Sequence, residues 1–417
     1  MASSLDSYST GRIARALSVA ERFVFRSPTT SPESGARSLP CLILLLFEAM
    51  IRTIHVSGYR SIRELCLELQ SINVLTGPNG CGKSNLYNSL VLIGRGVRGQ
   101  LARAIAEEGG TPSLFWAGGE RIRYQRKKPP KRVVLGFEAE DFGYEIQIGL
   151  PSFNEHALNT MFKLDPRVKE EYIWPANTNR RVLLLKRDEP SAWLRNSDGA
   201  MVAYPFAVSK HESVLSQIID PHLYPEISAL RNEVSRWRFY HHFRTDADSL
   251  LRQPQIGVQT EVLAQDGSDI AASLQTILEI GDDALLRETI STAFRGASLV
   301  IEAADTLFSL SLHTPGLLRP LQARELSDGQ LRFLCLCAAL LSPRPPSLLA
   351  LNEPETSLHP DLIDSLGQLM VRAAEHTQLW ITTHSRALAE SIERHSGIRR
   401  VCLHMLEGET RISSSSN

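Results

Sequence analysis

The stretch Gly77-Pro78-Asn79-Gly80-Cys81-Gly82-Lys83-Ser84 decides the fold of this chain of 417 residues. It fits the pattern G-x-x-x-x-G-K-[ST] at every required position. The glycines let successive backbone N–H groups turn inward around phosphate oxygens, and the N-terminus of a following helix adds positive potential. We expect Lys83 to reach the β- and γ-phosphates of a nucleotide and the Ser84 hydroxyl to bind Mg²⁺.

The residues on both sides of this loop favour a phosphate site over a chance match in a glycine-rich turn. Residues 72–76 are a short apolar stretch typical of a strand, and residues 84–93 have helical apolar spacing. Upstream, residues 51–57 and 65–69 alternate apolar and polar side chains, as half-buried strands do. The sequence therefore predicts a strand, a phosphate loop and a helix in that order.

A second cluster of polar residues ends the apolar stretch 347–351, which we predict to be a buried strand. Glu353 stands where a P-loop ATPase places the carboxylate that polarises the attacking water, and it is our candidate general base. Asn352 stands on the metal side, where an acid is usual. An amide accepts a hydrogen bond from a metal-bound water but supplies no charge, so we expect weak Mg²⁺ binding or slow turnover.

Two further motifs lie around this strand. Leu326-Ser327-Asp328-Gly329-Gln330 precedes an apolar helix predicted at 328–341 and resembles the ABC signature L-S-G-G-Q, with Asp328 in place of a glycine. A strand predicted at 378–383 ends in His384. A lone histidine is more often structural than catalytic, but its spacing from Glu353 favours a role at the site. A helix is predicted between them at 360–374.

Together these motifs resemble the RecF/SMC-like and overcoming-lysogenization-defect-like branch of the ABC ATPases. Residues 353–360 resemble that branch's E-P-E-x-x-L-H-P, and residues 54–62 resemble its first strand and turn. The resemblance implies that Ser327 and Gly329 contact the γ-phosphate held by a second copy of the chain, so that two ATP molecules lie within a homodimer. It also implies that His384 senses the γ-phosphate. We expect the C-terminal Toprim nuclease domain of the overcoming-lysogenization-defect family to be missing here. No glutamine matches the family's Q-loop clearly, and Gln100 and Gln125 are the two candidates.

The predicted site follows from these motifs and this resemblance. Catalytic roles fall to Lys83, Glu353 and His384, and Mg²⁺ binding to Ser84 and Asn352. The residues expected to contact ATP are Gly77, Asn79, Gly80, Cys81, Gly82, Lys83, Ser84, Asn85, Ser327, Gly329 and Gln330.

The predicted fold class is α/β: a P-loop ABC-type head with a central, mostly parallel sheet, an antiparallel β subdomain and an inserted, mixed or helical middle segment. Residues 50–150 would form the N-terminal half of the head, 151–310 the inserted arm, and 311–417 the C-terminal half. Within the arm, helical spacing appears at 223–237, 269–280 and 284–293, without the heptads of a long coiled coil. Residues 1–49 are expected to be a leader, disordered or not native, because patterned sequence starts after Met50.

Composition limits the choice of partners. The formal net charge of −1 leaves no global basic field, so DNA would need a local patch. Residues 125–132 are basic and are expected to form the turn of a hairpin within 121–150, either as a DNA contact or as a solvated tip. Residues 236–244 alternate aromatic and basic side chains, and there we favour a buried strand over a nucleic-acid surface. The apolar run 41–47 is too short to span a membrane.

Six scattered cysteines without a C-x-x-C pair indicate a reducing, cytoplasmic setting, and Cys335 and Cys337 are expected to be buried apolar residues. The leading hypothesis is an ATPase that dimerises on ATP and acts on DNA, in genome maintenance or anti-phage defence. The alternative is a slow, ATP-gated regulatory module that recruits a separate effector protein. A transporter subunit is disfavoured by the 151–310 insertion and by the L-H-P motif.

Overall fold

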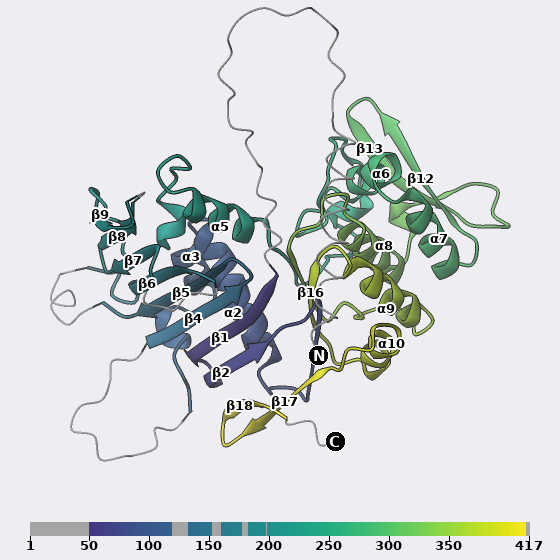
Figure 1. Cartoon of the computed structure of the whole chain (residues 1–417). Helices are drawn as coiled ribbons and strands as arrows, with labels where there is room; N and C mark the ends of the chain where they lie inside the picture. Colours follow the sequence, from purple (N-terminus) through teal and green to yellow (C-terminus); the bar gives the residue numbers. More distant parts are fainter. Residues whose placement is uncertain (1–49, 119–131, 152–159, 177–181, 197, 414–417) are drawn as a thin grey trace, which may run out of the picture. The chain divides into compact units, whose positions relative to one another are not determined.

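The computed structural model describes residues 50–118, 132–151, 160–176, 182–196 and 198–413 (Figure 1). The expected leader 1–49, the apolar run 41–47, Gln125 and all of the basic stretch 125–132 except Arg132 lie outside these residues. Within the described part of the chain, no helix is both long enough and apolar enough to span a membrane. Cys335 and Cys337 are fully buried, which confirms their predicted role as core residues.

A six-stranded, mostly parallel sheet forms the centre of the fold, in the order β10-β15-β16-β3-β17-β18. Only the last pair is antiparallel. Both faces of its central strands β3, β15 and β16 are covered, which explains why these strands are short, largely apolar runs. The strands are β3 (Ile72–Thr76), β10 (Arg238–Tyr240), β15 (Leu348–Asn352), β16 (Gln378–Thr382), β17 (Val401–Leu406) and β18 (Glu409–Ile412).

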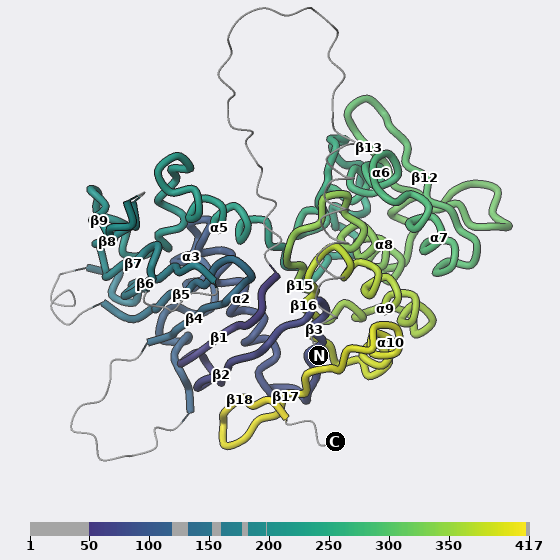
Figure 2. Tube along the Cα trace, viewed as in Figure 1, coloured from purple at the N-terminus to yellow at the C-terminus, as the bar shows by residue number. Residues whose placement is uncertain are grey.

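Alternate side chains of β15 enter two different hydrophobic cores. Leu348 and Ala350 join the core that contains helix α2 (Lys83–Val97), whereas Leu349 and Leu351 join the core of α8 (Asp328–Leu340). Helix α9 (Leu362–Ala373) and helix α10 (Arg386–Ser396) belong to this second core as well. Figure 2 shows α2 on one side of β15 and β16 and the later helices on the other.

An antiparallel sheet of eight strands, ordered β2-β1-β4-β5-β6-β7-β8-β9, packs into the same core as α2. Helix α2 therefore lies between two sheets, which is why its apolar residues cover most of its circumference. The strands are β1 (Ile51–Tyr59), β2 (Ile62–Glu68), β4 (Arg132–Ala139), β5 (Phe142–Gly149), β6 (Arg167–Pro175), β7 (Leu185–Asp188), β8 (Ser191–Arg195) and β9 (Met201–Ala203).

Segments of the middle region 151–310 contribute to three different sheets. Strands β6 to β9 extend the antiparallel sheet, β10 pairs with β15, and a small third sheet has the order β11-β13-β12 with β14 paired to β13. The third sheet consists of β11 (Gln255–Ile256), β12 (Ser298–Ala304), β13 (Leu307–His313) and β14 (Leu321–Gln322). The remaining helices are α3 (Leu101–Glu107), α5 (Pro225–Arg236), α6 (Ile270–Ile280) and α7 (Asp283–Ala293), with the 3₁₀ turns η1 (Thr111–Ser113), η2 (Val214–Ser216), η3 (Leu250–Arg252) and η4 (Ala323–Glu325).

Most predicted elements are confirmed, with two differences. Helix α2 continues to Val97, beyond the predicted end at 93, because Gly94 leaves room for the ring of Phe239, which a Cβ would approach to 2.9 Å. The hairpin β4–β5 reverses between Ala139 and Phe142, and not at the basic stretch, which precedes β4. The aromatic residues of segment 236–244 are buried as expected, Trp237 and Phe239 among them.

A buried ion pair links strands of the antiparallel sheet. The side chains of Glu171 on β6 and Arg187 on β7 are both fully buried, with Arg187 Nη1 3.2 Å from Glu171 Oε2. The Glu171 carboxylate also accepts hydrogen bonds from the hydroxyls of Tyr144 and Ser213 and from the Val214 amide. Burial and the neighbouring Glu171 raise the pKa of Tyr144 far above its usual value. This network of hydrogen bonds and the ion pair offsets the free-energy cost of removing the Glu171 and Arg187 charges from water.

We predict that Glu171→Ala lowers the free energy of unfolding by about 3 to 5 kcal/mol, because it leaves the Arg187 guanidinium buried without its counter-charge. Urea denaturation followed by circular dichroism measures the change. Arg103→Ala, which removes an exposed partner of Glu107 on α3, is the control and should leave the midpoint close to that of the wild type. Equal midpoints for the two variants would contradict the prediction.

Candidate functional site

The phosphate loop joins β3 to α2 at the C-terminal edge of the parallel sheet. Gly80 and Gly82 have φ values of 76° and 103°, a region that favours glycine. Gly82 is the N-cap of α2 and has no side chain to cap it, so the first amides of the helix stay available to an anion. The Lys83 ammonium donates to the carbonyl oxygens of Gly77 (2.7 Å) and Pro78 (3.1 Å). A positive charge is thus held within the loop.

The hairpin β17–β18 packs closely against this loop. A Cβ on Gly77 would lie 2.3 Å from the carbonyl oxygen of Leu403, and one on Gly82 would lie 2.1 Å from Oγ1 of Thr410. The hydroxyls of Ser61 and Thr410 are 2.7 Å apart, and the Asn85 amide donates to Ser61 at 2.7 Å. The structure therefore surrounds the predicted residues Gly77, Gly82 and Asn85 with the C-terminal hairpin. Ser84 is exposed at the first turn of α2.

Glu353 and His384 meet at the same edge of the sheet, where β15 and β16 end. His384 Nε2 lies 3.5 Å from Glu353 Oε1, and both side chains are partly exposed. The Glu353 amide donates to the carbonyl oxygen of Thr382 at 2.8 Å, and Glu353 itself has a φ of 48°. A side chain at positive φ is strained, so this turn is held by its surroundings.

Asn352 ends β15 opposite Thr382, whose hydroxyl donates to Asn352 Oδ1 at 2.6 Å. The bond directs the amide oxygen of Asn352 towards Thr382 on β16. A carbonyl oxygen has a second lone pair and can still accept from a metal-bound water.

The signature segment begins α8 with a reciprocal capping box. Ser327 Oγ accepts from the Gln330 amide, and Gln330 Oε1 accepts from the Ser327 amide. Gly329 lies against the loop that follows Glu353, since a Cβ there would come within 2.7 Å of the Ser357 carbonyl oxygen. Asp328, the departure from the signature, is paired with Arg252 at 2.8 Å. Its carboxylate therefore has a fixed counter-charge.

The motifs divide between the two faces of the parallel sheet. The P-loop helix α2 is in one core and the signature helix α8 is in the other. The structure thus brings Lys83, Glu353 and His384 to one edge, whereas Ser327, Gly329 and Gln330 start a helix that packs on the opposite face from α2 (Figure 1).

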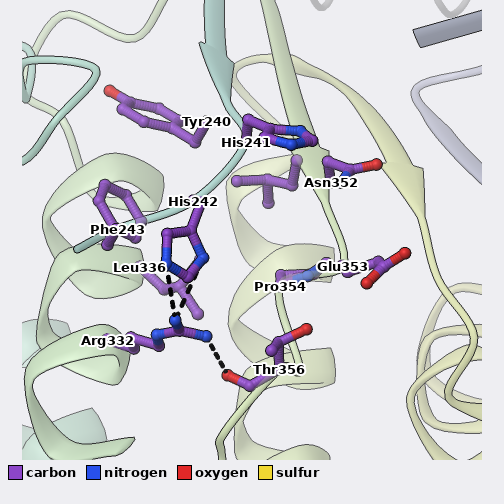
Figure 3. Close-up of a pocket in the computed structure, with 11 residues that line it drawn as sticks. Tyr240, His241, His242, Phe243, Arg332, Leu336, Asn352, Glu353, Pro354 and Thr356 are labelled. Carbon is purple, nitrogen blue, oxygen red and sulfur yellow. Dashed lines mark hydrogen bonds between the residues drawn. The ribbon is translucent and has the colours of Figure 1, made fainter. Parts of the chain in front are cut away.

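Two histidines that the sequence analysis did not single out lie beside Asn352. His241 and His242 follow β10, which pairs with β15, and they line a cavity of about 170 Å³ together with Asn352 and Glu353. Figure 3 shows the Arg332 guanidinium between the His242 ring (3.1 Å) and the Thr356 carbonyl oxygen (3.0 Å). Burial, then Arg332 and His241, lower the pKa of His242. The sequence feature that could have indicated these two residues is a pair of histidines directly after a short apolar strand.

His241 and His242 therefore lie at the end of β10, the strand that neighbours β15, and β15 leads to Glu353. Gln100, one of the two glutamines considered for a Q-loop, is exposed before α3, and Gln125 lies outside the described residues.

Residues 72–390 match the family model described as "AAA domain, putative AbiEii toxin, Type IV TA system". The chain belongs to this AAA domain family. It is 32% identical over 108 residues to the phosphate import ATP-binding protein PstB of Malacoplasma penetrans. The aligned residues cover 26% of this chain and 33% of PstB. It is 34% identical over 102 residues to the uncharacterized protein MJECL10 of Methanocaldococcus jannaschii, covering 23% of this chain and 45% of that protein. The chain thus matches less than half of the length of these relatives.

Two solved structures resemble the fold at low identity. The SMC head domain from Thermotoga maritima covers 88% of this chain and 100% of its own, at 15% identity and a TM-score of 0.43. A structure of the SMC head bound to the C-terminal winged-helix domain of ScpA covers 88% and 98%, at 12% identity and a TM-score of 0.49. From the family match, this AAA family member is a P-loop ATPase of the AAA/ABC type and binds ATP.

We predict that Gly82→Ala weakens ATP binding at least about tenfold more than Gly80→Ala, a difference of about 1.4 kcal/mol. Both glycines have positive φ, but a Cβ at Gly82 meets Thr410, while one at Gly80 has no atom of the described residues within 4 Å. Titration with a fluorescent ATP analogue measures the affinities. Adding Thr410→Ala to Gly82→Ala should recover part of the binding, and equal losses in the two single variants would contradict the prediction.

Proposed function

We propose that this ATPase works as a head-to-head homodimer that closes on two ATP molecules, and that it acts on DNA in anti-phage defence. The observation that carries the proposal is the separation of two phosphate-binding elements, α2 with its loop and the start of α8, onto opposite faces of one sheet. In this proposal the start of α8 does not reach the γ-phosphate held by the phosphate loop of its own chain. A second copy supplies the missing end.

In this proposal Glu353 accepts the proton of the attacking water, and His384, 3.5 Å away, orients the carboxylate and contacts the γ-phosphate. Lys83 and the amides of α2 hold the phosphates from one chain, and Ser327 and Gly329 hold the γ-phosphate from the other. The neutral oxygens of Ser84 and Asn352 fit Mg²⁺, which binds few protein ligands directly and keeps several waters. When bound, the ion would offset phosphate charge.

The family description supports defence over genome maintenance, because it names a putative toxin of a toxin–antitoxin system. That the protein acts on DNA is part of the proposal. Arg132, the one described residue of the basic stretch, is 2.6 Å from Glu170 and is engaged within the sheet. The alternative, a slow ATP-gated module that recruits an effector protein, is favoured by the neutral Asn352. Single-turnover hydrolysis rates that DNA leaves unchanged would support this alternative.

We predict that Glu353→Gln forms a stable dimer in the presence of ATP and Mg²⁺, because ATP remains between the heads when the base is missing. Light scattering coupled to size-exclusion chromatography measures the mass, with and without duplex DNA in the sample. The double variant Glu353→Gln with Ser327→Arg should stay monomeric, since a long cation replaces the capping hydroxyl at the start of α8. A monomeric Glu353→Gln at saturating ATP would refute the dimer.

We predict that Asn352→Asp lowers the Mg²⁺ concentration needed for half-maximal hydrolysis by on the order of tenfold, because it adds a charge beside the metal-bound water. Asn352→Ala, which removes the oxygen without adding charge, should shift the curve the other way. Hydrolysis rates across a Mg²⁺ titration provide the measurement. Identical curves for wild type and Asn352→Asp would exclude Asn352 from the metal side.

A further inference from the structure

The carboxylate of Glu355 links the two loops that carry Glu353 and His384. Its Oε1 accepts three hydrogen bonds, from Thr383 Oγ1 (2.6 Å), the His384 amide (3.0 Å) and the Ser385 amide (3.0 Å). All three donors belong to the segment between β16 and α10. One carboxylate oxygen of Glu355 therefore binds the segment 383–385, which includes the main-chain amide of His384.

Thr383 strengthens this link. Its hydroxyl donates to Glu355 and accepts from the Ser385 amide at 2.9 Å, and its side chain is fully buried. Ser385 in turn caps α10 by accepting from the Leu388 amide. The Glu355 carboxylate thus stands at the N-terminus of α10, where the helix dipole favours negative charge.

The second carboxylate oxygen, Oε2, is buried and has no hydrogen-bond partner among the described residues. A buried polar atom without a partner destabilises the folded state. The three bonds to Oε1 offset this cost. Glu355 therefore fixes the segment 383–385 against the loop 353–357.

These contacts also involve the loops that carry Glu353 and His384, the two side chains proposed to act in hydrolysis. Glu353 is tied to β16 through its own amide, and Glu355, two residues later, ties the same turn to the amide of His384. Both links lie close to the pair in which Glu353 Oε1 and His384 Nε2 are 3.5 Å apart. The His384 amide thus connects the main chain of the histidine directly to the loop of the base.

We propose that Glu355 is a positioning residue for hydrolysis, which acts by holding His384 at its distance from Glu353. The inference rests on the proposed function, in which Glu353 is the base and His384 contacts the γ-phosphate. Gln at this position keeps the size of the side chain but weakens each of the three bonds, because a neutral amide oxygen accepts less strongly than a carboxylate. The imidazole then samples a wider range of positions.

A double-mutant cycle tests the proposal in the full chain, with kcat and KM for ATP measured for Glu355→Gln, His384→Ala and the double variant. A misplacement of about 1 Å costs up to about 100-fold in rate, so we expect Glu355→Gln to lower kcat by about 10- to 100-fold with little change in KM. In the His384→Ala background the same change should lower kcat less than about twofold, because the group it positions is gone.

Glu390→Gln is the matched control, since Glu390 lies on α10, the helix whose N-terminus Glu355 contacts, and pairs with Arg386 on the exposed surface. It should leave kcat at the wild-type value. If Glu355→Gln fails to fold, Thr383→Val replaces it, because this near-isosteric change removes one of the three donors and leaves the carboxylate in place. It should lower kcat by a smaller factor that also disappears in the His384→Ala background.

Two results would overturn the inference: wild-type kcat in Glu355→Gln, or an equal fold loss with and without His384, which indicates general destabilisation. Glu353→Gln separates this failure from that of the proposed function. If Glu353→Gln hydrolyses ATP like the wild type, the proposed base is wrong. If it is inactive while the cycle is additive, only the role of Glu355 is wrong.

Discussion

The structure depends on the parallel register of β3, β15 and β16. Asn352 lies opposite Thr382, and Thr382 lies opposite Leu75, so three strands from distant parts of the chain end at one level. The loops that follow them must turn at the same edge of the sheet. This places the phosphate loop, Glu353 and His384 together, and the cleft at the carboxyl ends of parallel strands is where such folds bind ligands.

Helix α2 connects the parallel sheet to the rest of the molecule. It lies between the parallel sheet and the antiparallel sheet, and side chains of both sheets meet in one core around it. The N-terminus of the helix is held by neighbours on several sides, including Leu403 and Thr410 of the C-terminal hairpin. An anion bound at α2 is therefore held by a helix that has little freedom to move, which suits a site where phosphate positions must be fixed.

Polar contacts between different segments stabilise the antiparallel sheet and the site, and the sequence did not reveal them. Glu171 pairs with Arg187, and Glu355 holds the amide of His384, through partners 16 and 29 residues away along the chain. Such pairs depend on which strands become neighbours. The same holds for His242, which reaches the site because β10 pairs with β15.

The sequence by itself determined the phosphate-loop pattern, the strands and helices around it, and the positions of Glu353 and His384 directly after two of these strands, because these features depend on local spacing and on apolar periods of two or 3.6 residues. Only the tertiary structure decided the order of the strands, the distribution of residues 151–310 over three sheets, and the opposite faces taken by α2 and α8. Strand order is set by packing between segments far apart in the chain, which no local pattern encodes.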